Sequence, residues 1–220
     1  MLSSQILALS LKESFNHMVY IPEGRVPTEQ LPLVIFLHGA GERGDDARLL
    51  SVHGPFKRIE KEGWKPNFIC VAPQCPEKAH WTDKTEALKV FIDIVAQKYN
   101  ADPRRIYITG ISMGGFGTWA MLARWGNFFA AAVPVCGGGS PWTAEEFCSV
   151  PVWAFHGDAD SVVDVRYTRD MIAALKSRIG VNPGAVEPKV TEYPGVDHDS
   201  WTATYESEEM WAWLLSQEKK

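Results

Sequence analysis

The 220-residue sequence contains no apolar run of the roughly 18–20 residues that a helix needs to cross a bilayer. It also has no basic block, because its lysines and arginines are scattered and its formal net charge is -5. These absences argue against a membrane protein and against a nucleic-acid partner. Residues 1–18 lack the basic start and uninterrupted apolar segment of a secretory signal. We therefore expect a cytoplasmic protein, exported only if a signal precedes this sequence.

Cysteine is scarce and poorly spaced for metal binding. The four cysteines have no C-x-x-C spacing and no companion pair of histidines: Cys70, Cys75, Cys136 and Cys148. We expect reduced thiols, no metal and no cofactor, with a disulfide only in an exported protein. Internal repeats, low-complexity segments and linkers are absent as well, so residues 1–220 are predicted to form one domain.

Apolar runs and helical patterns alternate along the chain. The runs predict strands at 17–22, 31–39, 67–74, 104–110, 130–138, 150–158 and 188–195. The segments between and after them predict helices at 82–99, 112–125, 143–147, 164–180 and 207–217. This alternation indicates an α/β fold with a mostly parallel central sheet, helices on both faces and 17–22 as an antiparallel edge strand.

Three helix boundaries carry residues that commonly mark helix ends. Asp83 and Glu86 resemble a capping box, and Thr143 is expected to cap a short helix. Gly180 is a plausible left-handed stop for the helix before it. In a parallel sheet, ligands bind beyond the carboxyl ends of the strands, so the polar residues at those ends are the candidate site.

One serine stands at such a strand end between two glycines. The stretch Gly110-x-Ser112-x-Gly114 follows a predicted strand and opens a predicted helix. A nucleophilic serine on a sharp strand-to-helix turn needs small neighbours two residues before and after it. The alternative interpretation is a glycine-rich turn in which Ser112 merely caps the helix. The strand and the helix around it favour a nucleophile.

A serine hydroxyl needs a base, and a histidine needs an acid to orient it. The chain order required in this context is nucleophile, acid, histidine, which selects His198. His38 and His156 each precede a glycine and are expected to hydrogen-bond locally. Between Ser112 and His198, Asp160 is the preferred acid. Asp164 is the second choice because it also suits a helix N-cap.

Two backbone N–H groups are needed to stabilise the oxyanion of a tetrahedral intermediate. One is expected from Met113, the residue after the nucleophile. The other is expected from the loop HGAGERG at 38–44, with Ala40 preferred and Gly41 next.

Several longer stretches resemble the α/β-hydrolase superfamily. They read LPLVIFLHGAGERG, VAPQCP, DPRRIYITGISMGGFGTWAMLARW, PVCGGG, PVWAFHGDADSVV and YPGVDHDSW. They are most similar to its lidless carboxylesterase branch, near the phospholipase/carboxylesterase and acyl-protein-thioesterase group and the bacterial esterases labelled "predicted peptidase". The resemblance implies one domain without a substantial lid, and a triad of Ser112, Asp160 and His198. Two positions depart from it: Ser161 replaces a common proline, and Asp197 replaces a common neutral residue.

The expected activity is that of a serine carboxylesterase acting on a small-molecule ester, with a short-chain or aromatic acyl group, through an acyl-enzyme intermediate. A serine peptidase or acyl thioesterase would use the same triad, and a noncatalytic binding protein of this fold usually lacks one of its members. Aromatic residues and one glycine near the predicted rim are candidates for the substrate pocket: Gly41, Trp81, Phe116, Trp142 and Trp201.

Overall fold

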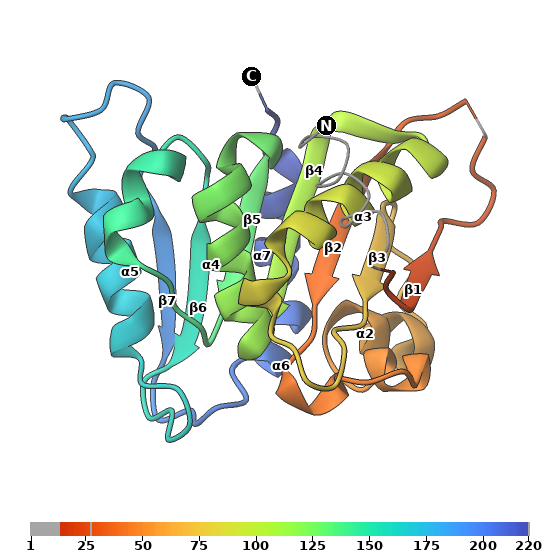
Figure 1. Ribbon diagram of the computed structural model, residues 1–220, viewed down its shortest axis with the longest axis horizontal. Helices are drawn as coiled ribbons and strands as arrows, with labels where there is room; N and C mark the ends of the chain where they lie inside the picture. The colour runs from red at the N-terminus through yellow and green to blue at the C-terminus, as the bar shows by residue number, and fades with distance from the viewer. Residues whose placement is uncertain (1–13, 27, 220) are drawn as a thin grey trace, which may run out of the picture.

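The computed structural model describes residues 14–26 and 28–219, so the absence of a secretory signal predicted for residues 1–18 falls mostly outside this range. Seven strands form one sheet in the order β1-β3-β2-β4-β5-β6-β7 (Figure 1). They are β1 (His17–Tyr20), β2 (Leu31–Leu37), β3 (Ile69–Pro73), β4 (Ala101–Ile111), β5 (Ala131–Val135), β6 (Trp153–Gly157) and β7 (Lys189–Tyr193). β1 pairs antiparallel with β3, and the other neighbours pair in parallel. The predicted fold class and antiparallel edge are confirmed.

Six α-helices lie in the described part of the chain. They are α2 (Gly54–Glu62), α3 (Thr85–Lys98), α4 (Met113–Trp125), α5 (Arg166–Lys176), α6 (Trp201–Glu206) and α7 (Glu208–Ser216). Short 3-10 helices fill several connections: η1 (Ala40–Glu42), η2 (Ala47–Ser51), η3 (Trp81–Asp83), η4 (Gly126–Phe128) and η5 (Pro141–Phe147). Helices α2 and α6 are absent from the prediction.

The strand β2 shows why both faces of the sheet are covered. All seven of its residues are buried, which fits its uninterrupted apolar sequence. Successive side chains of a strand point to opposite faces. Leu33 and Ile35 accordingly join the core that includes α3, α4 and α5, whereas Val34 and Phe36 join the core that includes α2, α6 and α7. Figure 1 shows α3, α4 and α5 in front of the sheet and α7 behind it.

The predicted helix-boundary residues behave differently in the structure. Asp83 belongs to η3, and α3 begins after Lys84 without a side-chain cap, so the capping box is wrong. The Thr143 hydroxyl donates to the carbonyl of Ser140 inside η5 and caps nothing. Gly180 has a left-handed φ of 77°, but α5 has already ended at Lys176. Local hydrogen bonds in these turns outcompete the caps that the sequence suggests.

All four cysteines are buried and unpaired with one another, as predicted for reduced thiols. Across the described ranges, no helix combines the length and the apolar character that crossing a membrane requires.

Candidate active site

The turn between β4 and α4 holds Ser112 in a backbone conformation that side chains rarely adopt. Its φ is 52° and its ψ is -116°, while its N–H donates to the carbonyl of Val135 at 3.0 Å. A Cβ at Gly110 would collide with the carbonyl of Gly114, and a Cβ at Gly114 would collide with the carbonyl of Leu37. The two glycines therefore allow α4 to begin in close contact with the sheet. The strained backbone conformation at this turn is that of Ser112.

His198 links this serine to a carboxylate. Its Nε2 lies 3.0 Å from the Ser112 Oγ, and its Nδ1 lies 2.7 Å from the Asp160 Oδ2. The three residues are far apart in sequence but meet at the carboxyl ends of β4, β6 and β7. The side chain of Asp160 has no exposed surface, and that of His198 is 18% exposed. This is the arrangement in which a histidine takes a proton from a serine while a carboxylate orients its ring.

Asp160 is held by several donors at once. Its Oδ1 accepts the N–H groups of Val162 at 2.9 Å and Val163 at 2.8 Å. The Nε2 of His156 lies 3.2 Å from the same Oδ2 that His198 contacts. Burial acts to raise the pKa of Asp160, but the hydrogen bonds from His198, Val163 and Val162 outweigh it and hold that pKa below its ordinary value. The carboxylate is therefore ionised and fixed.

Two other carboxylates of these loops, including the second-choice acid, have partners outside the triad. The Asp164 carboxylate binds Arg166, with Oδ2 2.6 Å from one guanidinium nitrogen. Its Oδ1 also accepts the backbone N–H of Arg166, the first residue of α5, so the side chain does serve the helix start. Asp199 accepts the N–H and hydroxyl of Thr202. Of the two predicted acids, the structure brings Asp160 and not Asp164 to His198.

The two departures from the hydrolase pattern are hydrogen-bonded to each other. Asp197 Oδ1 accepts the N–H of Ser161 at 2.7 Å and its hydroxyl at 2.9 Å. It also accepts the N–H of His198 at 2.8 Å. A proline at position 161 has no N–H to donate. Ser161 and Asp197 therefore tie the loop that carries Asp160 to the loop that carries His198.

A cavity of about 370 Å³ opens beside the serine. Its lining consists of Ala40, His80, Thr82, Ser112, Met113 and Phe116. Met113 is the first residue of α4, and Ala40 is the first residue of η1, so both N–H groups belong to the unpaired starts of helical turns. The two expected oxyanion donors therefore border the same cavity as Ser112.

Solved structures share the fold that carries this site. A crystal structure of a thermostable esterase superposes with a TM-score of 0.75 and 34% identity, covering 92% of this chain and 59% of that one. The chain has the α/β-hydrolase fold. Residues 81–143 match the prolyl oligopeptidase family, a segment that includes Ser112 but neither Asp160 nor His198.

Two curated proteins are similar to this chain in sequence. A poly(3-hydroxyalkanoate) depolymerase of Paucimonas lemoignei is 38% identical over 163 residues, covering 62% of this chain and 36% of its own. A bifunctional acetylxylan esterase/xylanase of Neocallimastix patriciarum is 25% identical over 190 residues, covering 84% of this chain and 27% of its own. The chain thus spans about a third of the length of these relatives or less.

Trp81, predicted as a pocket residue, does not line the cavity beside Ser112. It has no exposed surface, and its indole N–H donates to the carbonyl of His38 at 3.0 Å. The His38 ring in turn accepts the N–H of Cys75 at 2.9 Å and lies 2.6 Å from the carbonyl of Gly39. Trp81 and His38 therefore shape the loop that bears Ala40 from behind. The local bonding predicted for His38 is confirmed.

The remaining predicted pocket residues lie in different places. Phe116 lines the cavity. Trp201 packs edge-on against His198, with ring centroids 5.2 Å apart, and likewise against His53 at 5.3 Å. Trp142 is 84% exposed on η5, and Gly41 follows Ala40 in η1 without lining the cavity. Trp201 is thus placed to hold the histidine ring.

A buried thiol lies under the triad. Among the described residues, the donor atoms of Cys136, Asp160 and His198 lie within 4.8 Å of one another. Burial is the main cause that raises the pKa of the Cys136 thiol to about 12, so it stays protonated at neutral pH. Asp160 and His198 are hydrogen-bonded to each other. These three residues therefore fit a catalytic triad with a neighbouring thiol better than they fit a metal site.

Two residues that line the cavity carry no motif in the sequence. His80 and Thr82 line the cavity from the connection between β3 and α3. His156 bonds Thr168 and Val163, which confirms its expected local hydrogen bonding. Its approach to Asp160 was not predicted. The spacing of four between His156 and Asp160 within HGDAD is the only signal in the sequence, and it does not specify a contact.

Proposed function

We propose that this chain is a serine carboxylesterase that hydrolyses esters with short-chain or aromatic acyl groups. The observation that carries the proposal is the bridging position of His198, with one ring nitrogen 3.0 Å from the Ser112 hydroxyl and the other 2.7 Å from Asp160. The esterases among the relatives and the structural neighbours support the same reaction class.

The reaction follows from the geometry. The Ser112 Oγ attacks the ester carbonyl while the His198 Nε2 takes the hydroxyl proton. Asp160 accepts the Nδ1–H bond and stabilises the imidazolium that forms. The N–H groups of Met113 and Ala40 face the oxyanion. Collapse of the tetrahedral intermediate expels the alcohol, to which His198 returns the proton. Water then attacks the acyl-serine by the same route and releases the acid.

The cavity supports a preference for a compact acyl group. Its apolar walls come from Phe116, Met113 and Ala40, and its volume of about 370 Å³ suits a short or ring-shaped acid. An amide or thioester would meet the same triad. Comparing a 4-nitrophenyl ester, a 4-nitroanilide and an acyl thioester of one acid therefore separates esterase, peptidase and thioesterase activity. We expect the ester to be hydrolysed best relative to its uncatalysed rate.

The decisive experiment is Ser112→Ala, assayed with 4-nitrophenyl acetate and butyrate. Activity should fall by at least about a thousandfold, because binding and the oxyanion donors alone retain only a small residual rate. The matched control is Ser177→Ala. The Ser177 hydroxyl donates only to the Ala174 carbonyl near the end of α5, away from the triad. A fluorophosphonate probe should add one label to the wild type and none to Ser112→Ala. A folded wild type that neither hydrolyses esters nor takes the label is a noncatalytic binding protein.

A further inference from the structure

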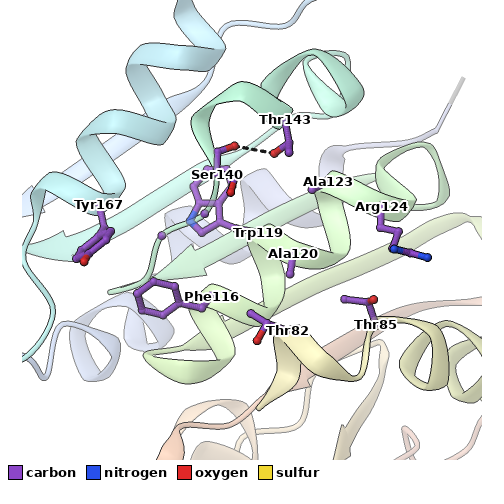
Figure 2. A pocket seen from close by; sticks show the side chains of 12 residues that line it. Thr82, Thr85, Phe116, Trp119, Ala120, Ala123, Arg124, Ser140, Thr143 and Tyr167 are labelled. Atoms are coloured by element: carbon purple, nitrogen blue, oxygen red, sulfur yellow. Dashed lines mark hydrogen bonds between the residues drawn. The ribbon is translucent and has the colours of Figure 1, made fainter. Parts of the chain in front are cut away.

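A second pocket lies beyond the cavity at Ser112. It has a volume of about 520 Å³ and follows α4 towards η5 and α5 (Figure 2). Thr82 and Phe116 line both spaces, so these two residues form the wall between them. Figure 2 shows the Phe116 ring at one end of the second pocket, between Tyr167 and Thr82. A group that enters the second pocket from Ser112 therefore has to pass Phe116.

Both spaces lie on the acyl side of the nucleophile. The leaving alcohol takes its proton from the His198 Nε2, so it leaves on the side of Ser112 that faces His198. His198 lines neither space. The first space is bordered instead by Ala40 and Met113, whose N–H groups are the expected donors to the carbonyl oxygen of the acyl group. The acyl chain is thus the part of the ester that points towards the wall.

Phe116 is bulky, whereas the residues that follow it on the same face of α4 are small. Residues three and four apart share a helix face, and Ala120 and Ala123 both line the second pocket. The Phe116 N–H donates to the Ser112 carbonyl at 3.0 Å, which places its ring one turn from the nucleophile. The ring meets Tyr167 edge-on, at an interplanar angle of 70° with centroids 5.8 Å apart. This contact holds the ring at the end of the first space.

Two glycines in the loop after β5 keep the second pocket open behind this ring. A Cβ at Gly138 would lie 2.6 Å from the Cβ of Tyr167, and a Cβ at Gly139 would lie 2.9 Å from that of Trp119. Both positions line the pocket. Side chains at either position would take up space that an extended chain can occupy.

The polar groups in the lining of the second pocket already have partners or are enclosed. Among the described residues that line it, Arg124 alone is charged, and it forms an ion pair with Glu86. The Thr143 hydroxyl donates to the Ser140 carbonyl at 2.7 Å, as Figure 2 shows. The indole nitrogen of Trp119 is buried inside the wall and does not face a ligand. Such a lining suits an uncharged alkyl chain better than an ionic group.

We propose that Phe116 determines the length of acyl chain that this protein accepts, because its ring ends the acyl site and closes off the second pocket. The proposal rests on the proposed esterase function and deepens it. A short acyl group fits in front of the ring, whereas a long one collides with it. Removing the ring joins the two spaces, and the additional methylene groups of a long acyl chain then become buried in the second pocket.

The kinetic test is Phe116→Ala, assayed with monomeric 4-nitrophenyl esters from acetate to decanoate. The kcat/KM for octanoate relative to butyrate should rise at least about tenfold over the wild-type ratio, since each buried methylene group is worth up to roughly fourfold. Phe116→Val, which keeps more of the packing, should raise the ratio by less. Phe128→Ala is the matched control, because Phe128 is likewise half-buried but lines neither space. It should keep the wild-type ratio.

A second substitution shows where the longer chain lies. Ala120 is one turn beyond Phe116 and lines the second pocket only. In the double variant Phe116→Ala/Ala120→Phe the new phenyl group fills that pocket, so the octanoate ratio should fall back towards the wild-type value. A series of alkyl acetates, in which the alcohol lengthens instead, should not respond to Phe116→Ala. An unchanged ratio in active Phe116→Ala protein, a double variant that keeps the long-chain ratio, or a response of the alkyl acetates alone overturns the proposal.

A binding test separates this proposal from the esterase function. In Ser112→Ala protein, titrations with butanamide and octanamide followed by NMR measure the acyl site without hydrolysis. Adding Phe116→Ala should tighten the binding of octanamide at least about tenfold and should not tighten that of butanamide. If the wild type hydrolyses no ester but octanamide shows this gain, the esterase function is wrong and the role of Phe116 stands. If esters are hydrolysed and octanamide gains nothing, the role of Phe116 is wrong and the esterase function stands.

Discussion

At the scale of single residues, the position of Asp160 decides how the histidine works. Its Oδ2 accepts the Nδ1–H of His198, which leaves Nε2 free to take the Ser112 proton. Asp160→Asn replaces an oxygen acceptor with an amide that can favour the wrong ring tautomer. We expect kcat to fall about 10³- to 10⁴-fold, with the fold intact by circular dichroism.

The control for this prediction is Asp164→Asn, because Asp164 pairs with Arg166 and not with the triad. Its kcat should stay within about twofold of the wild type, since exposed ion pairs contribute little. A larger loss for Asp164→Asn than for Asp160→Asn would reverse the assignment of the acid.

His156 is expected to act as a positioning residue. Its Nε2 faces two acceptors, the Val163 carbonyl at 2.9 Å and the Asp160 Oδ2 at 3.2 Å, so this nitrogen carries a proton. His156→Leu removes that donor and lets the carboxylate move. We expect kcat to fall roughly ten- to a hundredfold, the size typical of a small misplacement, with KM for 4-nitrophenyl acetate nearly unchanged.

The conservative variant His156→Gln, which retains an N–H donor, should recover part of the lost kcat at an equal melting temperature. If both variants lose stability but keep the wild-type kcat, the Val162 and Val163 N–H groups alone hold Asp160. His156 then serves the loop and not the reaction.

The sequence predicts a site residue when the order of residues along the chain leaves few candidates for its role. Ser112 and His198 follow from the elbow and from the order of nucleophile, acid and histidine. The pocket is less predictable, because a tryptophan beside a motif can face either side of its backbone. Trp81 turned inward to bond the His38 carbonyl, whereas Ala120 and Gly138 became pocket walls that no motif marks. Whether a residue lines a cavity depends on how separate elements pack against one another, and the local sequence does not determine that packing.

At the scale of elements, the junction of β2, β4 and α4 depends on the absence of side chains. A Cβ at Gly114 would lie 2.5 Å from the Leu37 carbonyl carbon and 2.8 Å from the His38 oxygen. Both are backbone atoms that cannot rotate away. Gly114→Ala should therefore separate α4 from β2 and destabilise the protein by more than about 3 kcal/mol, at the upper end of single substitutions.

Thermal unfolding monitored by circular dichroism measures this effect, and soluble yield serves as the readout if the variant fails to fold. Gly41→Ala is the matched control, because no atom lies within 4 Å of the added Cβ and its φ is not left-handed. A melting temperature for Gly114→Ala that equals that of Gly41→Ala contradicts the proposed close packing.

The order of the elements was predictable, but their ends were not. Uninterrupted apolar runs such as that of β2 allow only a strand buried on both faces, so all seven predicted strands are found. Helix α2 was missed because its buried residues cluster at its first turn, Gly54 to Phe56, and show no repeating pattern. Gly63, its left-handed C-cap with a φ of 71°, is the one residue in the sequence that marks where it ends. Short helices depend more on their tertiary contacts than on periodicity.

At the scale of the whole molecule, the parallel sheet gathers distant loops at one edge. Ser112 follows β4, Asp160 follows β6 and His198 follows β7, while Ala40 follows β2. Because these strands share one direction, their carboxyl ends open on the same side. The buried His38 directly follows β2 at this edge. Its hydrogen bonds stabilise the loop there, and they thereby contribute to the stability of the entire fold.

His38 couples the stability of the fold to pH. Burial is the main cause that lowers its pKa from 6.5 to about 4. The neutral ring is fully bonded, since Nε2 accepts the Cys75 N–H and Nδ1 donates to the Gly39 carbonyl. A proton on Nε2 would point at the N–H of Cys75. Between about pH 4 and pH 6.5, the unfolded chain therefore binds this proton and the folded protein does not.

Stability should consequently fall as the pH drops from about 6.5 to about 4, and this contribution should level off below that range. The largest loss that the shift allows is about 3 kcal/mol. Urea unfolding of the wild type and His38→Gln at pH 7, 6, 5 and 4.5 measures it, because the glutamine does not titrate. The difference in unfolding free energy between the two proteins should shrink towards acid pH, since the carboxylates they share cancel. A difference that stays constant across these pH values would mean that His38 titrates alike in the folded and unfolded chain.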